Sequence, residues 1–112
     1  GVTDVYSNDY AFVALKKGLG QAVCWGSSKS GGDCSGVDFG DVTDVYSTRG
    51  AFVALKKGLG QAVCWGTSAY GDGWDHGGNC SGVDFGDVTD VYSTSSAFVA
   101  LKKGLGQAVC WG

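Results

Sequence analysis

The feature that most constrains this chain is a tandem repeat in which long stretches recur without a single substitution. The stretch AFVALKKGLGQAVCWG occurs at residues 11–26, 51–66 and 97–112. The shorter stretch VTDVYS precedes each copy, and successive copies are offset by 40 and then 46 residues. Repeat periods of this size are typical of solenoids, propellers and stacked arrays, in which each unit buries its apolar face against the next.

The repeat predicts three units and places their difference in length in one connection. We assign unit 1 to residues 1–41, unit 2 to residues 42–87 and a truncated unit 3 to residues 88–112, and we expect the chain to be a segment of a longer array. The stretch CSGVDFGD closes the first two units, preceded by SSKSGGD in one and by TSAYGDGWDHGGN in the other. An insertion confined to Gly- and Asp-rich sequence is typical of a surface loop.

Local sequence favours β-strands within each unit. Short runs rich in Val, Tyr, Phe and Trp are interrupted by Gly and Asp, as is typical of strands. The chain contains 21 Gly among 112 residues and its acidic residues are all Asp, whereas long helices favour Glu and avoid Gly. We predict three strands per unit, with the sequences VTDVYS, AFVALKK and QAVCWG. A weaker fourth strand is predicted at residues 36–41 and 82–87, which read GVDFGD.

The stretch KGLG joins the second and third strands of each unit, and Gly18 and Gly20 are free to adopt positive φ there. An amphipathic helix is the alternative, because Phe12, Leu15 and Leu19 are spaced at helical intervals. The two glycines and the Val-Cys-Trp run that follows count against a helix. The predicted fold is therefore an all-β tandem repeat of three- to four-stranded antiparallel units, arranged like propeller blades or as a stacked array.

Each unit resembles the repeat of the RCC1-like β-propellers over about 25 residues. A blade of that family reads Val-x-x-Val, then an Ala-Leu strand, a Gly turn and a strand that closes on Trp-Gly. The matching residues of unit 1 are Val2, Val5, Ala14, Leu15, Gly20, Val23, Trp25 and Gly26. The family continues after Trp-Gly with a Gly-Gln-Leu-Gly type of segment and closes with about seven blades, whereas this chain continues with GGDCSGVDFGD and has three units. The resemblance implies a blade-like fold and a binding or scaffolding role.

The five cysteines recur with the units and are candidates for disulfides. Three of them, Cys24, Cys64 and Cys110, lie in the VCWG strands. The other two, Cys34 and Cys80, open the CSG segments. Pairing within units would join Cys24 to Cys34 and Cys64 to Cys80 and leave Cys110 over, while pairing across units would join Cys34 to Cys64. Buried free thiols are the third alternative. Recurrence of the pair favours disulfides, and hence an oxidising setting that is extracellular or at the cell surface.

Two further groups of residues are candidates for packing and for contact with a partner. Trp25, Trp65 and Trp111 close each unit, and we expect them to pack between units. The long loop of unit 2 is a candidate surface for contact with a partner. Its candidate contact residues are Tyr70, Asp72, Trp74, Asp75 and His76. Asn79 heads an Asn-Cys-Ser sequence that fits the N-glycosylation pattern.

Catalytic and metal chemistry have little support in the sequence. One His beside Asp72 and Asp75 leaves a zinc site without a second imidazole, so we read this stretch as a polar loop. Asp38, Asp41 and Asp44 stand at three-residue intervals and recur as Asp84, Asp87 and Asp90, but this spacing is not that of an EF-hand or RTX calcium loop. We expect no metal and no cofactor. Identical units also offer the same groups three times, whereas an active site needs one asymmetric set.

The composition also limits the partners. A net charge of −3 with a single Arg argues against a nucleic-acid partner, and no apolar run approaches the roughly 20 residues of a membrane span. We therefore predict a non-enzymatic, self-assembling structural protein of an extracellular array or filament, whose partners are copies of itself placed end to end. The alternative is a protein-binding platform that forms part of an RCC1-like propeller.

Overall fold

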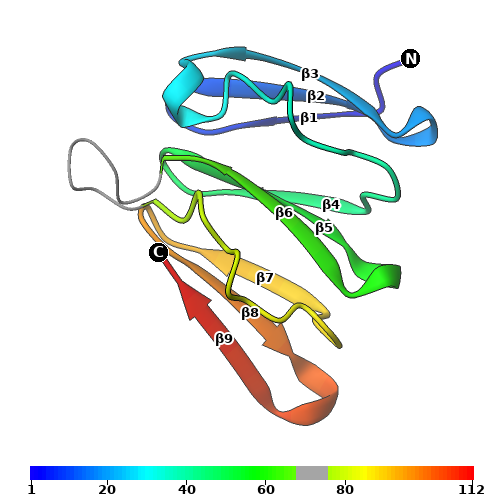
Figure 1. Ribbon diagram of the computed structural model, residues 1–112, viewed down its shortest axis with the longest axis vertical. Coiled ribbons are helices and arrows are strands. Elements are labelled where there is room, and N and C mark those ends of the chain that lie inside the picture. Colours follow the sequence, from blue (N-terminus) through cyan, green and yellow to red (C-terminus); the bar gives the residue numbers. More distant parts are fainter. Residues whose placement is uncertain (68–75) are drawn as a thin grey trace.

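Three small antiparallel sheets follow one another along the chain (Figure 1). The computed structural model describes residues 1–67 and 76–112. Sheet 1 contains β1 (Asp4–Ser7), β2 (Ala11–Lys16) and β3 (Gln21–Gly26). Sheet 2 contains β4 (Asp44–Ser47), β5 (Ala51–Lys56) and β6 (Gln61–Gly66), and sheet 3 contains β7 (Asp90–Ser93), β8 (Phe98–Lys102) and β9 (Gln107–Trp111).

All three sheets share one strand order and one register. The AFVALK strand lies in the middle of each sheet, so that in sheet 1 Val13 pairs with Tyr6 on one side and with Cys24 on the other. The same pairs recur in sheets 2 and 3. Because successive side chains of a strand point to opposite faces, this register places Phe and Trp on one face of each unit and Leu, Cys and Tyr on the other.

The all-β tandem repeat is confirmed, and each unit has three strands. The fourth strand predicted at residues 36–41 and 82–87 is wrong, because both segments form turns. Asp41 and Asp87 adopt φ of 64° and 66°, in the left-handed region that breaks an extended strand. The Oδ1 atoms of Asp38 and Asp84 accept hydrogen bonds from the backbone N–H two residues later, at 2.9 Å in each case, which tightens these turns.

The KGLG connections are short 3-10 turns, which are η1 (Lys17–Leu19), η3 (Lys57–Leu59) and η4 (Lys103–Leu105). Gly20 follows η1 with φ 61°, as predicted. Gly18 does not use this freedom, because it lies within the 3-10 turn. A fourth 3-10 turn, η2 (Ser28–Ser30), lies in the loop after sheet 1.

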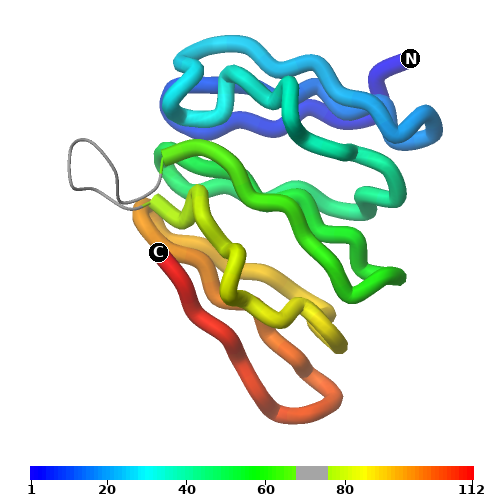
Figure 2. Tube along the Cα trace, viewed as in Figure 1, coloured from blue at the N-terminus to red at the C-terminus, as the bar shows by residue number. Residues whose placement is uncertain are grey.

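The three sheets are stacked one on another and are inclined to one another (Figures 1 and 2). The ends that hold the first hairpin turns converge, while the KGLG turns are spread apart. Backbone hydrogen bonds link the converging turns, from Asp9 N–H to the Arg49 carbonyl at 3.2 Å and from Arg49 N–H to the Ser95 carbonyl at 3.0 Å. The molecule measures 37 × 36 × 19 Å, so it is a thin wedge one sheet wide.

The core consists of two layers, one in each joint between neighbouring sheets. The first lies between the Ala-Val-Leu face of β2 and the Phe-Trp face of sheet 2, and the second repeats this arrangement between sheets 2 and 3. Strand β5 is covered on both faces, and all six of its residues are buried. The identical residues of β2 include an exposed Phe12, because sheet 1 is covered on one face only.

Candidate functional site

The joint between sheets 1 and 2 is organised around Trp65. Its ring stacks on Phe52 of the same sheet, with centroids 5.4 Å apart, and receives the edge of Phe39 at 5.4 Å and an interplanar angle of 87°. Phe52 is fully buried and Trp65 is 8% exposed. Stacked and edge-to-face pairs of this kind add about 0.5–1.5 kcal/mol each to the burial of the rings. Trp65 therefore packs between units, as predicted.

The second joint reproduces this geometry with different residues of the same types. Trp111 stacks on Phe98 at 5.2 Å and receives the edge of Phe85 at 5.3 Å and 83°. Phe98 is fully buried, and Trp111 is partly buried. The two joints are thus independent copies of one interface, so a contact that recurs in both is a property of the repeat.

Each tryptophan also donates a hydrogen bond to the connecting segment before its sheet. The indole N–H of Trp65 lies 3.1 Å from the Gly31 carbonyl oxygen, and that of Trp111 lies 3.2 Å from the Gly77 carbonyl oxygen. Gly31 has φ 102°, and a Cβ atom there would lie 2.5 Å from the Phe52 ring. Only glycine allows the backbone to approach the aromatic pair this closely.

A lysine of each covered sheet forms an ion pair with the same connecting segment. The Lys56 and Lys102 ammonium groups lie 3.6 Å from carboxylate oxygens of Asp38 and Asp84. The lysine side chains are about 10% exposed and the aspartates more than 80% exposed, so each pair lies at the rim of its joint. The backbone N–H of Gly40, followed by the charge of Lys56, lowers the pKa of Asp38 below its usual range. The pKa of Asp84 is lowered in the same way.

Disulfides fasten each connecting segment to the sheet that it leaves. Cys24 is bonded to Cys34, and Cys64 is bonded to Cys80, with Cα atoms 5.9 Å apart in both cases. The prediction of disulfides is confirmed, and of the pairings left open the structure has the one within units, because each connecting segment runs beside the last strand of the sheet that it leaves. Cys110 is a free, exposed thiol. A small disulfide-bonded domain of this kind is consistent with an oxidising extracellular location.

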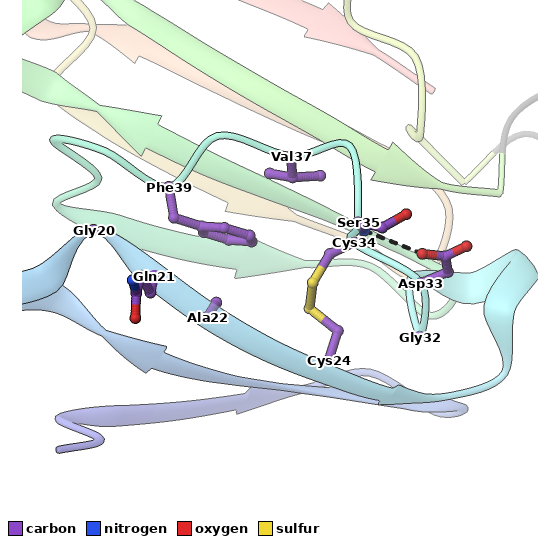
Figure 3. Close-up of a pocket in the computed structure, with 10 residues that line it drawn as sticks. All are labelled: Gly20, Gln21, Ala22, Cys24, Gly32, Asp33, Cys34, Ser35, Val37 and Phe39. Atoms are coloured by element: carbon purple, nitrogen blue, oxygen red, sulfur yellow. Dashed lines mark hydrogen bonds between the residues drawn. A yellow bond between two sulfur atoms is a disulfide. The ribbon is translucent and has the colours of Figure 1, made fainter.

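Figure 3 shows the open groove beside the first disulfide, between β3 and the segment from Gly32 to Phe39. Gln21 and Ala22 lie along one side, and Val37 and Phe39 lie along the other. The backbone N–H of Ser35 donates to Asp33 Oδ1 at 3.1 Å, which fixes the turn at the disulfide. The same groove recurs beside the second disulfide, so it belongs to the repeat.

Sheet 1 leaves uncovered the face that is buried in the other two sheets. We define the aromatic face as Val5, Phe12, Val23 and Trp25. The exposed fractions of these residues are 60%, 43%, 51% and 46%, in that order. In sheet 2, the residues at the positions of Val5 and Phe12 are only 6% and 0% exposed. Phe12 and Trp25 are already stacked, with centroids 5.2 Å apart and an interplanar angle of 16°. Trp25 is therefore exposed, unlike the two other tryptophans that close the units.

Sheet 3 leaves uncovered the opposite face. We define the aliphatic face as Tyr92, Val99, Leu101, Ala108 and Cys110. Tyr92 is 59% exposed, Ala108 and Cys110 are exposed, and Val99 and Leu101 are half-buried. The equivalent residues of sheet 1 pack in the first joint, where Val13 and Leu15 are fully buried. The two free faces are therefore the two halves of the interface that occurs twice inside the chain.

Apart from residue 1, the described residues that differ between the units lie at the converging ends of the sheets. We define the variable end as the hairpin turns 8–10, 48–50 and 94–96 with the loop residues 27–33, 67 and 76–79, since residues 68–75 lie outside the described part. The hairpin turns of sheets 1 and 2 contact each other. The Arg49 Nε atom lies 3.1 Å from an Asp9 carboxylate oxygen, and an Arg49 N–H donates to the Tyr10 hydroxyl at 3.2 Å.

The structure describes one member of the predicted contact loop. His76 takes the place that Ser30 has in unit 1: its carbonyl oxygen accepts from Thr48 Oγ1 at 2.6 Å, as that of Ser30 accepts from Asn8 Nδ2 at 2.7 Å. Its Nδ1 atom lies 3.2 Å from the Ser95 carbonyl oxygen. The other predicted contact residues, Tyr70, Asp72, Trp74 and Asp75, lie outside the described residues.

Asn79 is exposed, and its side-chain oxygen accepts from the Ser81 N–H at 3.0 Å. Its glycosylation remains a prediction. Within residues 1–67 and 76–112, no three His, Cys, Asp or Glu side chains gather in a way that could hold a metal ion. The recurring aspartates of the connecting segments instead tighten turns and pair with lysines. A helix with the length and apolarity to cross a membrane is not found in the described part of the chain.

Sequence reasoning did not find the part that the connecting segment plays in each joint. The recurrence of Asp-Phe in CSGVDFGD was a signal, since a loop that only links two units has no need of an invariant aromatic residue. Comparisons with protein-family models, curated proteins and solved structures found no match to this chain. The case for a function therefore rests on the geometry of the joints and of the two free faces.

Proposed function

We propose that this chain is a structural protein that assembles end to end, with the aliphatic face of sheet 3 of one copy packed on the aromatic face of sheet 1 of the next. The observation that supports this proposal is that the same two faces already pack together twice within the chain. An interface between two different faces is heterologous, so it joins copies head to tail and generates a ring or an open filament.

The exposed side chains supply a driving force for this contact. Val5, Phe12 and Trp25 are each about half exposed in the single chain, whereas their counterparts in sheet 2 are nearly fully buried. Complete burial of a large apolar side chain contributes about 1.5–3 kcal/mol. Part of this gain is offset by the loss of translational and rotational freedom on association.

The proposed setting is an extracellular array or filament. Two disulfides hold the connecting segments, and such bonds persist in oxidising environments. A non-enzymatic role is in keeping with the repetition of the same groups in each unit, because packing contacts recur from unit to unit whereas an active site is asymmetric. Similarity to an RCC1-like propeller is a proposal of the same kind, supported by the strand pattern that closes on Trp-Gly.

Sedimentation velocity over a series of protein concentrations tests the assembly. We expect the average sedimentation coefficient to rise with concentration and to show species larger than a dimer. Val5→Asp places a charge on the aromatic face and should abolish this rise. Leu59→Asp is the matched control, because Leu59 is 55% exposed, like the 60% of Val5, but lies on a KGLG turn away from both free faces.

A wild-type chain that remains monomeric at every concentration would contradict the proposal. Equal loss of assembly in the Leu59→Asp variant would also contradict it, since that result would place the contact elsewhere on the surface. Circular dichroism of both variants shows whether the sheets remain folded.

A protein-binding platform is the second candidate function, and the variable end is the observation that favours it. On an identical scaffold, the described hairpin turns present different residues, including the exposed Tyr10 and Arg49. Replacement of residues 48–50 by the Thr-Ser-Ser of unit 3 would remove the Arg49 contacts and leave both free faces intact. A platform predicts that a purified extracellular partner binds the wild-type chain and loses affinity for this variant, with no change in self-association. Equal binding to both chains would contradict it.

A further inference from the structure

In each joint, the connecting segment covers the aromatic pair together with the preceding sheet. In the first joint, the segment supplies the Gly31 carbonyl to the Trp65 indole N–H, the edge of Phe39 to the Trp65 ring and the carboxylate of Asp38 to the Lys56 ammonium. These three contacts reach a sheet that follows the segment in the chain. The disulfide holds the other side of the segment to the sheet that precedes it.

The second joint repeats all three contacts with the same spacing along the chain. Gly77 accepts from the Trp111 indole N–H, Phe85 places its edge on Trp111, and Asp84 pairs with Lys102. In both joints the Asp and Phe are the seventh and eighth residues after the glycine. The shared pattern is therefore Gly, six residues, Asp and Phe, bound to a sheet that presents Phe, Trp and Lys.

Sheet 1 presents the same three receptor groups, which are Phe12, Trp25 and Lys16. Phe12 and Trp25 are stacked in the same way as the covered pair Phe52 and Trp65. The aromatic pair of sheet 1 therefore has its stacked geometry although no segment covers it. In the described part of the chain, Lys16 has no carboxylate within ion-pair distance, and the Trp25 indole N–H has no hydrogen-bond acceptor. The face lacks the preceding sheet and the connecting segment that together cover the other two sheets.

We propose that sheet 1 binds, in trans, an acidic-aromatic peptide segment of the pattern Gly-(six residues)-Asp-Phe, supplied by another polypeptide. The glycine carbonyl accepts from Trp25, the Phe edge rests on the Trp25 ring, and the Asp pairs with Lys16. The glycine is required because a Cβ atom at the equivalent Gly31 would lie 2.5 Å from the Phe52 ring. This inference rests on the proposed end-to-end assembly and names a segment that completes its contact.

A synthetic peptide tests this site on the intact chain. The peptide carries the sequence of residues 27–41 with Ser in place of Cys34, which prevents disulfide exchange. Titration into 15N-labelled protein should shift the indole N–H resonance of Trp25 in a saturable way, while those of Trp65 and Trp111, whose N–H groups are already hydrogen-bonded, remain in place.

Matched peptides separate the three contacts. Phe39→Ala in the peptide removes the buried ring, and we expect it to weaken binding about 100-fold. Gly31→Ala in the peptide should weaken binding about ten-fold or more, because the carbonyl can no longer approach the indole. Asp38→Asn should cost a few-fold in affinity and remove the dependence on salt that an exposed ion pair produces.

Two results would overturn the inference: no saturable shift of Trp25 at millimolar peptide, or equal binding of the wild-type and Phe39→Ala peptides. Sedimentation of the chain without peptide reports the assembly separately. A chain that assembles but does not bind the peptide refutes this inference alone. Binding of the peptide by a chain that stays monomeric refutes the proposed assembly and leaves the peptide site standing.

Discussion

The repeat provides an internal comparison of one substitution in two environments, Phe52→Ala and Phe12→Ala. Both residues lie in an AFVALK strand, and both stack on the Trp of the neighbouring strand, at 5.4 and 5.2 Å. They differ in that Phe52 is 0% exposed within a joint while Phe12 is 43% exposed on the aromatic face. The difference between the two free energies of unfolding therefore isolates the joint.

The expected magnitudes follow from burial. Truncation of a fully buried Phe costs about 3–5 kcal/mol, because transfer free energy is lost and a cavity remains. Phe12→Ala removes a half-exposed ring and leaves no closed cavity, so we expect roughly 1–2 kcal/mol. The local stacking on Trp is lost in both variants and cancels in the comparison. A gap of about 2 kcal/mol remains, which corresponds to roughly 8 °C in Tm at ~4 °C per kcal/mol.

Thermal and urea unfolding at a low protein concentration, without reductant, measure both variants against the wild-type chain. Equal destabilisation by the two substitutions would refute the assignment of the stabilising contact to the joint. Repetition at high concentration adds a second test, because end-to-end assembly covers Phe12. The cost of Phe12→Ala should then rise toward that of Phe52→Ala, and a gap that stays constant would count against assembly through this face.

Three further predictions concern the connecting segments and the thiols. Gly31→Ala should destabilise the chain by about 2 kcal/mol or more through its clash with the Phe52 ring, whereas Gly36→Ala, where a Cβ atom meets nothing within 4 Å, should leave Tm nearly unchanged. A thiol assay on the folded chain should find one reactive group, Cys110, and five after reduction and unfolding. The pKa of Asp38 is lower in the folded chain than its usual value, so its contribution is present above about pH 4 and is lost as the pH falls through the folded pKa. The Tm of the Asp38→Asn variant should therefore fall less steeply than that of the wild-type chain as the pH is lowered below about 4. An equally steep fall of Tm in both chains would contradict this.

The strands and their order could be predicted from sequence because the local signals agree. The AFVALKK strand alternates Phe and Lys on one face with Ala, Val and Leu on the other, and both faces are needed in a stacked unit. Pairing of Cys24 with Cys34 was one of several open alternatives. The structure selects it because β3 and the segment from Gly32 to Phe39 run beside each other.

The environment of each copy could not be predicted, because identical residues have identical local signals. Trp25 and Trp65 are both preceded by the stretch AFVALKKGLGQAVC and followed by a glycine, yet one is 46% exposed and the other 8%. Only the position of a sheet in the stack distinguishes them. The weaker strand predicted at residues 36–41 is absent, and the Val37 and Phe39 of this segment pack in the joint between two sheets.

The placement of the two disulfides has a mechanical consequence. Each bond closes a loop onto the sheet it leaves, spanning 10 and 16 residues, and neither crosses to the next sheet. When the stack is pulled along its length, the residues inside these loops cannot extend, because a disulfide joins the two ends of each loop. Each of these residues would otherwise add ~3.4 Å to the length of the extended chain. The part of the chain that can extend between sheets 1 and 2 is limited to the residues from Cys34 to Asp44. Between sheets 2 and 3 it is limited to the residues from Cys80 to Asp90. A stretched chain would thus separate joint by joint on short tethers and remain within reach of the faces it must re-engage when the force is released.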